Sequence, residues 1–344
     1  MDKNSEIINQ AIQGSLNTID QTREREIISR RFGLTGQRET LEQIGEMLSI
    51  TRERVRQLEK AILVHLSVAA EDGLIPELAA AEKIIIRNLA EMGRIARISS
   101  LGEKLYGRPI TDAEHACLAF IANISLHLTY IDSNDRYYAA IGIADYGNSR
   151  EIHAKVDEIV QIIKRNKDVM TLEQLDNVLN YEHPDHIKAL ASISKQLATL
   201  GGVWGLAKWP SVNPRNIRDK IFVVLNAHKE PMHFAEIAKA ISESDFKRKN
   251  VTIQAIHNEL IKDNRFVLIG RGIYALASWG YSKGTVADII TQLLEKSKHP
   301  LKRDEIVKKV LAKRKVKEST ILLNLQNRKL FEKVDKNSYQ LAQK

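Results

Sequence analysis

The feature that most constrains this chain is a unit of three helical segments and a strand–turn–strand, which recurs along the sequence. Each copy begins with an amphipathic helical pattern, continues with two further short helices, and closes with two short apolar strands around a tight turn. Corresponding apolar positions of successive copies are 72, 61 and 69 residues apart. These irregular steps predict tandem independent domains, because a solenoid keeps a stricter period. The opening helices are predicted at 81–92, 155–166, 216–228 and 285–297. The copy that begins with 81–92 has the faintest pattern.

Three helices followed by a β-hairpin is the order of elements in a winged-helix domain. The third helix of such a domain can enter the major groove of DNA, while the hairpin touches the backbone or the minor groove. Winged helices also serve as protein–protein modules, so DNA and protein are alternative partners for each copy. The acidic copies in the middle of the chain favour protein, and the basic last copy favours DNA.

The charges of the chain are distributed unevenly. The formal net charge is +9, and residues 283–344 alone carry 16 Lys and Arg against 7 Asp and Glu, whereas residues 71–212 have a net charge of −4. Such a basic segment attracts a polyanion, and a solvated surface is the alternative. Two basic runs that precede third helices are the best phosphate-binding candidates outside the amino-terminal segment. They consist of Lys247, Arg248 and Lys249, and of Lys313, Arg314, Lys315 and Lys317.

The amino-terminal segment has a different pattern, in which two helices are joined by a tight turn. Thr40 and Gln43 have the spacing of a capping box at the start of the first of these helices. A sharp turn at Ser49 follows, and Thr51 is placed to cap a second helix that continues to about Leu66. The apolar positions predict that the outer face of this second helix carries Arg52, Glu53, Arg56, Gln57 and Lys60.

This outer face has the chemistry of base recognition. Arginine can bond guanine O6 and N7, glutamate can accept from cytosine N4, and glutamine can pair with adenine. Arg54 and Lys60 suit phosphates, which position a helix on DNA without specifying sequence. A solvated face with ion pairs between neighbouring turns is the alternative, and the charge pattern alone does not decide between them.

Two stretches of the amino-terminal segment are TREREIISRRFGL (22–34) and TLEQIGEMLSITRERVRQLEKA (40–61). Together they resemble region 4 of the primary-type bacterial sigma factors. In that family this helix-turn-helix reads the promoter −35 element and docks on the flap of the RNA polymerase β subunit. The resemblance implies that Arg31 and Phe32 lie toward the polymerase-facing part. The residues that it assigns to base edges and the adjacent backbone are Arg52, Glu53, Arg56 and Gln57.

Two later stretches are NIRDKIFVVLNAHKEPMHFAEIAKAI (216–241) and TIQAIHNELIKDNRFVLIGRGIYALASWG (252–280). They resemble the HARE-type helix-turn-helix domain. That domain forms the amino-terminal half of the δ subunit of some bacterial RNA polymerases, and it is also found fused to DNA-modifying and chromatin proteins. The signature residues here are His233, Phe234, Glu236, Ile237, Gly270, Arg271, Gly272, Tyr274 and Trp279.

From these patterns we predict a mainly α fold with small β-hairpins, in which a helix-turn-helix is followed by tandem winged-helix domains. The five predicted domains are called the first to the fifth module below. Their limits are 1–72 (sigma region 4-like helix-turn-helix), 77–147 (possible degenerate winged helix), 150–212 (winged helix), 213–282 (HARE-type winged helix) and 283–344 (basic winged helix).

The sequence contains no catalytic constellation. Cys117 is the only cysteine, and His183, Asp185 and His186 lack the companions that a metal site needs, so Asp185 is better explained as a helix N-cap. A GxxxxGK[ST] phosphate loop, a run of 18 apolar residues and a signal-peptide pattern are all missing. We therefore expect a cytoplasmic (nucleoid) protein that is not an enzyme. We expect it to bind no cofactor, metal ion, membrane or small-molecule substrate.

We expect a sequence-specific DNA-binding transcription factor of sigma-region-4 type, which acts in transcription initiation on double-stranded DNA with the RNA polymerase core. Aromatic residues make up only 6% of the chain and do not cluster for stacking on unpaired bases, so we expect no promoter-melting domain. Two alternatives stay open. One is a δ-like accessory subunit that binds RNA polymerase, although the chain lacks the acidic tail of δ. The other is a DNA-binding subunit of a restriction or modification system.

Overall fold

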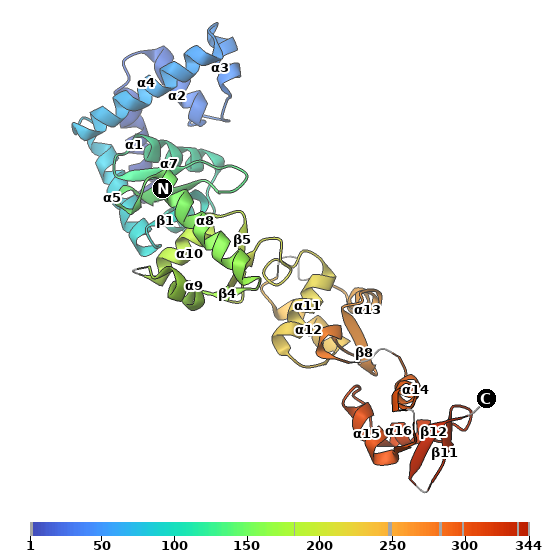
Figure 1. Cartoon of the computed structure of the whole chain (residues 1–344). Coiled ribbons are helices and arrows are strands. Elements are labelled where there is room, and N and C mark those ends of the chain that lie inside the picture. The colour runs from blue at the N-terminus through green and yellow to red at the C-terminus, as the bar shows by residue number, and fades with distance from the viewer. Residues whose placement is uncertain are drawn as a thin grey trace. The chain divides into compact units, whose positions relative to one another are not determined.

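The computed structural model describes residues 3–181, 183–246, 250–281, 284–297, 299–335 and 337–342 (Figure 1). The chain divides into two compact units, and the division lies between Lys208 and Trp209. Helices dominate the described parts of both units, and the sheets found there are antiparallel and three-stranded. This confirms the predicted fold class. No helix within the described ranges is long and apolar enough to cross a membrane.

The helix-turn-helix of the first module folds as the local sequence signals predict, and a further helix, α1 (Lys3–Asn17), precedes it. The other helices of the module are α2 (Thr22–Phe32), α3 (Leu41–Leu48) and α4 (Arg52–Glu71). The capping box forms before α3, because Thr40 Oγ1 accepts from the backbone N of Gln43 at 3.2 Å and Gln43 Oε1 accepts from that of Thr40 at 2.8 Å. Ser49 takes the left-handed conformation with φ 54°, and Thr51 Oγ1 caps α4 by accepting from the backbone N of Arg54 at 3.2 Å. The turn thus sets the start of α4.

The second module combines three helices with a sheet of strand order β1-β3-β2. Its elements are α5 (Pro76–Glu91), β1 (Ile95–Arg97), α6 (Ile98–Tyr106), α7 (Asp112–Ile124), β2 (Leu128–Ile131) and β3 (Ala140–Ile143). Helix α1 packs along α5, and its buried Ile8 and Ile12 share one core with Ile85 and Leu89. The amino-terminal helix therefore stabilises the second module as well as leading into the first.

The third module repeats this order and packs on the hairpin of the second. The short helix η1 (Ala144–Tyr146) ends the second module, and the elements of the third are α8 (Ser149–Asn166), β4 (Met170–Thr171), α9 (Leu172–Leu179), α10 (Pro184–Ile193), β5 (Leu197–Leu200) and β6 (Val203–Leu206). Tyr137 forms a β-bridge with Ser194. Arg97 donates to the carbonyl of Ser192 and lies 3.8 Å above the ring centroid of Tyr138. The three modules of this unit are thus joined by packed contacts.

The second unit holds the fourth and fifth modules, each again with three helices and a three-stranded sheet. The fourth consists of α11 (Ile217–His228), β7 (Met232–His233), α12 (Phe234–Glu243), α13 (Ile253–Lys262), β8 (Phe266–Gly270), β9 (Ile273–Leu276) and η2 (Ala277–Trp279). The fifth consists of α14 (Val286–Ser297), β10 (Leu301–Lys302), α15 (Arg303–Leu311), α16 (Glu318–Leu325), β11 (Phe331–Lys333) and β12 (Ser338–Leu341).

Each of the four sheets contains one strand that the sequence patterns did not reveal. Strands β1, β4, β7 and β10 precede the second helix of their modules and pair with the last strand of the hairpin. In the fourth module, for example, Met232 lies opposite Tyr274. These strands are two or three residues long, which is too short for alternation of apolar and polar residues to be recognised.

Candidate nucleic-acid interface

The first turns of α4 expose one face to solvent. Val55 and Ile62 point inward and are 0% and 3% exposed, which leaves the opposite side of the helix outward. The side chain of Arg52 is 70% exposed and that of Arg56 is 56% exposed. All six residues of α4 that the sequence predicted to contact DNA are exposed, namely Arg52, Glu53, Arg54, Arg56, Gln57 and Lys60.

Ion pairs join several of these side chains. Arg56 donates to both carboxylate oxygens of Glu53, with Nη2–Oε1 at 2.6 Å and Nε–Oε2 at 2.9 Å. These bonds hold the pKa of the Glu53 carboxyl below its usual range, so Glu53 stays an ionised acceptor. Arg52 Nη1 lies 3.7 Å from Glu42 Oε2. Because these pairs are exposed to solvent, they contribute little free energy, and exchanging them for contacts with a duplex costs little.

Arg31 and Phe32, the two residues predicted to face polymerase, lie mainly against the protein itself. Arg31 Nε donates to both carboxylate oxygens of Glu59 at 3.1 and 3.2 Å, and the two side chains are only 21% and 17% exposed. The ring of Phe32 meets that of Phe120 edge-on, with centroids 5.1 Å apart. The Phe32 contact joins the first module to α7 of the second, whereas the Arg31 pair joins α2 to α4 within the first module. A polymerase contact at Arg31 or Phe32 would have to compete with them.

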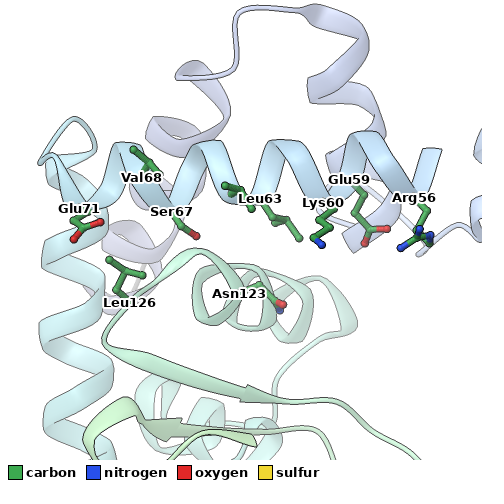
Figure 2. Close-up of a pocket in the computed structure, with 10 residues that line it drawn as sticks. Arg56, Glu59, Lys60, Leu63, Ser67, Val68, Glu71, Asn123 and Leu126 are labelled. Atoms are coloured by element: carbon green, nitrogen blue, oxygen red, sulfur yellow. The ribbon is translucent and has the colours of Figure 1, made fainter. Parts of the chain in front are cut away.

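A groove along α4 was not predicted (Figure 2). It has a volume of about 380 Å³ and extends from the turn that carries Arg56 toward Glu71 at the end of the helix. Val64, Val68 and Leu126 in its wall are 56%, 49% and 51% exposed. Exposed apolar side chains grouped in this way mark contact surfaces for proteins. The groove is lined by Arg56, Glu59, Lys60, Leu63, Val64, Ser67, Val68, Glu71, Asn123 and Leu126.

The basic runs outside the first module have different outcomes. Lys247, Arg248 and Lys249 lie outside the described residues. Lys315 and Lys317 are exposed, and Lys313 is half-buried. Arg314 differs from these lysines in its contacts. Its Nη1 donates to the carbonyl of Gly284, its Nε is buried, and burial lowers the pKa of its guanidinium. The Arg314 guanidinium is therefore partly buried and bonded within the fifth module, whereas Lys315 and Lys317 are exposed.

The third helices of the modules differ in how much of them is covered. Helix α7 buries seven residues between Cys117 and Ile124, and α10 buries five between Ile187 and Ile193. Helices α13 and α16 bury two residues each. The second and third modules therefore use this helix for packing, whereas the fourth and fifth leave half of its residues exposed.

The groups considered for other chemistry have structural roles. Cys117 is 9% exposed, and burial raises the pKa of its thiol to about 11, so the reactive thiolate is scarce at neutral pH. His183 is the N-cap of α10, because its Nδ1 accepts from the backbone N of Asp185 at 3.2 Å. The prediction that Asp185 is the cap was wrong. Among the described residues, no cluster of three His, Cys, Asp or Glu is placed to hold a metal ion.

Comparison with known proteins finds two family matches. Residues 21–67 match the model of sigma-70, region 4, and residues 216–279 match that of the HARE-HTH family, the helix-turn-helix domain of ASXL and restriction endonuclease proteins. Both resemblances inferred from the sequence are thereby confirmed. They connect the chain with helix-turn-helix DNA-binding domains, and the first connects it with transcription.

Curated relatives match the first of these segments. RNA polymerase sigma factors SigA1 and SigA4 of Synechococcus elongatus are 40% identical over 58 residues and 43% identical over 56 residues. The matches cover 17% and 16% of this chain, and 14% and 18% of those proteins. The sigma factor sigB of Arabidopsis thaliana is 51% identical over 41 residues, which are 12% of this chain and 7% of that protein. The chain thus spans less than a fifth of each relative.

Proposed function

We propose that the protein is a sequence-specific DNA-binding transcription factor that acts in initiation with RNA polymerase, and that α4 is its base-reading helix. The observation that carries this proposal is the exposed row of guanidinium, carboxylate and amide groups on α4, in the segment that matches sigma-70 region 4. In the major groove these groups fit guanine, cytosine and adenine respectively. Arg54 and Lys60, which are also exposed, supply phosphate contacts.

The fifth module supplies a second contact in this proposal. Lys313, Lys315 and Lys317 precede or begin α16 and are available to phosphates of an adjacent stretch of duplex. Contacts of this kind do not depend on base sequence, and they release counterions from the DNA. The affinity should therefore fall steeply as the salt concentration rises.

Selection of binding sites from random duplexes, with and without RNA polymerase core, tests the proposal. Arg52→Ala should relax the preference at one base pair, at a cost of about 1–3 kcal/mol there. Arg87→Ala is the matched control, because it also removes one exposed arginine, 82% exposed on α5, at a distance along the chain from α4. If both variants select the same sequences as the wild type, α4 does not read bases.

A polymerase-binding accessory subunit is the second candidate, and the apolar groove on α4 favours it. Capture of RNA polymerase core at high salt separates the two functions, since ionic DNA contacts weaken there while apolar contacts persist. If RNA polymerase core binds in the groove, Val68→Lys should abolish its capture. Val178→Lys places the same charge at a 60% exposed valine of α9 and should leave capture intact. Full capture by Val68→Lys would exclude the groove.

A further inference from the structure

A second pocket lies beside the groove on α4, and it is called the joint pocket below. Its walls come from the loop between α2 and α3 and from α4 of the first module, and from α7 and β2 of the second. Glu59, Leu63 and Asn123 line both the joint pocket and the groove (Figure 2). The volume of the joint pocket is about 590 Å³. Sites for small molecules have volumes of roughly 300–1,000 Å³ and are frequent where two folded parts meet, so both the size and the place suit a ligand.

Part of the wall of the joint pocket is apolar. Phe32 and Leu63 of the first module contribute to it, as do Ala116 and Ala119 of α7. The ring of Phe32 is held in place by its edge contact with Phe120. A wall of this kind favours the burial of an aliphatic or aromatic group of a ligand.

Two polar side chains of the second module, His115 and Tyr130, also line the joint pocket. Burial lowers the pKa of His115, while Asp112 opposes this effect and Arg38 adds to it. Burial, and then the charge of Asp132, raise the pKa of Tyr130 to about 12. At neutral pH the imidazole is therefore mainly uncharged and the phenol keeps its proton. Among the described residues the imidazole of His115 has no hydrogen-bond partner, so it is available to a ligand.

Three charged side chains of the joint pocket surround these two polar groups. Arg38, Asp112 and Asp132 line the pocket and are exposed. The charge of Arg38 affects the pKa of both polar groups, and each aspartate affects that of one of them. Within the part of the chain that the structure describes, Arg38 nevertheless forms no ion pair with either aspartate. The pocket thus contains a cation and two anions that do not neutralise one another.

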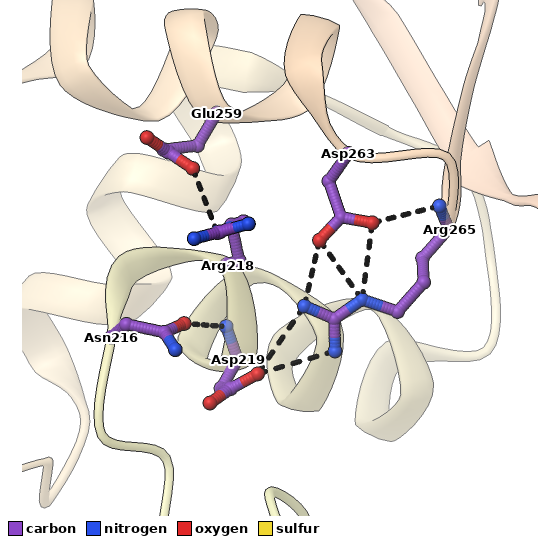
Figure 3. A network of polar contacts seen from close by, with 6 residues as sticks. All are labelled: Asn216, Arg218, Asp219, Glu259, Asp263 and Arg265. Atoms are coloured by element: carbon purple, nitrogen blue, oxygen red, sulfur yellow. Dashed lines mark hydrogen bonds and ion pairs between the residues drawn. The ribbon is translucent and has the colours of Figure 1, made fainter.

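Several other arginines of the chain are bonded to the carboxylates near them. In the fourth module, Arg265 pairs with Asp263 at 2.8 Å and with Asp219 at 3.2 Å (Figure 3). In the joint pocket itself, Arg31 Nε lies 3.1 Å from Glu59 Oε1. The charges of these arginines are satisfied within the protein. Those of Arg38 and the two aspartates are left for a ligand that carries both a negative and a positive group.

We propose that the joint pocket binds a small zwitterion with an apolar body, namely an apolar amino acid or a short apolar peptide. The carboxylate of the ligand pairs with Arg38, and its ammonium group pairs with Asp112 and Asp132. The apolar part lies against Phe32 and Ala119. A polyanion such as a nucleotide fits less well, because two aspartates outnumber the one unpaired arginine. The ligand contacts both modules and is released unchanged, so it joins the modules without being a substrate. This inference goes beyond the proposed DNA binding and does not depend on it.

Calorimetric titration of the full chain with matched probes tests the class of ligand. L-Phenylalanine and L-leucyl-L-leucine should bind. 3-Phenylpropionate lacks the ammonium group and 2-phenylethylamine lacks the carboxylate, so each should bind at least about tenfold more weakly than L-phenylalanine. Bound L-phenylalanine should also slow hydrogen exchange in α7. If neither zwitterion binds, or if 3-phenylpropionate binds as tightly as L-phenylalanine, the assignment is wrong.

Substitutions of the exposed charges test where the probe binds. Arg38→Gln should weaken the binding of L-phenylalanine by about tenfold to a hundredfold and remove most of its preference over 2-phenylethylamine. Asp112→Asn combined with Asp132→Asn should weaken the binding of L-phenylalanine and spare that of 3-phenylpropionate.

Two control variants remove exposed charges that do not line the joint pocket. Arg87→Gln changes a side chain on α5 that is 82% exposed, and Asp135→Asn changes an exposed residue of the same loop as Asp132. Both should bind L-phenylalanine as the wild type does. Unchanged binding by Arg38→Gln, or an equal loss in Arg38→Gln and Arg87→Gln, would mean that the probe does not bind through Arg38 and would overturn the inference.

Discussion

Helices α7 and α13 occupy the same place in the order of elements of their modules, yet the chain uses them differently (Figure 1). Helix α7 is buried along most of its length, with Phe120 fully inside and in contact with Phe32 of the first module. Helix α13 buries only Ile256 and Leu260. The difference teaches that a repeated element order fixes the local fold of a module but not the partner of its third helix.

The net charges of the modules differ in the same way as the coverage of their third helices. Residues 71–212, whose third helices are covered, have a net charge of −4, whereas residues 283–344, where α16 is open, have a net charge of +9. Acidic modules that pack on protein and basic modules with a less covered helix agree with the proposed DNA binding at the two ends of the chain. The first unit thus combines the exposed outer face of α4 with covered third helices, and the second unit has third helices that are less covered.

The strongest test of this comparison is a truncation in each kind of third helix. Phe120→Ala should destabilise the first unit by about 3–5 kcal/mol, because it leaves a cavity and removes the edge contact with Phe32. Leu323→Ala in α16, where the leucine is 67% exposed, should change stability by less than about 0.5 kcal/mol. Hydrogen exchange of the amides of each helix measures the two effects locally.

Equal effects of these two truncations on stability would contradict the difference between α7 and α16. A small effect of Phe120→Ala would mean that α7 is not a packing helix in solution. A large effect of Leu323→Ala would mean that α16 is covered, for instance by a second molecule, and that effect would then depend on protein concentration.

The second test separates charges within the basic loop of the fifth module. Replacing Lys313, Lys315 and Lys317 by Gln should lower the affinity for all duplexes alike, by roughly tenfold to a hundredfold at low salt, and should flatten the salt dependence. Arg314→Gln should leave the salt dependence unchanged and destabilise the fifth module instead, because its guanidinium donates to the carbonyl of Gly284. Salt titrations of duplex binding and hydrogen exchange of α15 distinguish the two. If Arg314→Gln flattens the salt dependence as the replacement of the three lysines does, the Arg314 side chain contacts DNA.

Local signals made the helix-turn-helix predictable from the sequence. The capping box at Thr40 and Gln43 and the cap at Thr51 act within one helical turn, and the structure shows all of them. The exposure of Arg52 and Arg56 followed from the apolar period of the same helix. A feature that depends on a few adjacent residues can be deduced from those residues.

Features that depend on distant residues could not be deduced in this way. The contact of Phe32 with Phe120 joins segments far apart in the sequence, and periodicity does not show which apolar face meets which. Arg314, whose Nε is buried, donates to the carbonyl of Gly284, which lies 30 residues earlier in the sequence. A run of basic residues looks uniform in the sequence, and only the fold shows which member points inward.

The smallest expected effect concerns the ion pair that begins α7. Glu114 accepts from the backbone N of Thr111 at 2.8 Å and from Arg108 at 2.6 and 3.0 Å. The hydrogen bonds from Arg108, and to a smaller extent those from Thr111, lower the pKa of Glu114 to about 2. Glu114→Gln should cost about 1 kcal/mol of stability at neutral pH, since it weakens the cap and removes the ion pair. Glu236→Gln changes the same position of the capping box of α12, where Glu236 accepts from the backbone N of His233 at 2.8 Å, and serves as the control.

The pH dependence of this effect has a defined sign. A carboxyl whose pKa is lower in the folded than in the unfolded chain stabilises the fold above its unfolded value, about 4.3, and this contribution is lost as the pH falls toward 2. The difference between wild type and Glu114→Gln should therefore be constant from pH 7 to about pH 5 and shrink below it. Hydrogen exchange of α7 over this range, in wild type and variant, gives the curve. A difference that persists unchanged at pH 3 would mean that the cap, rather than the charge of Arg108, stabilises the start of this covered helix.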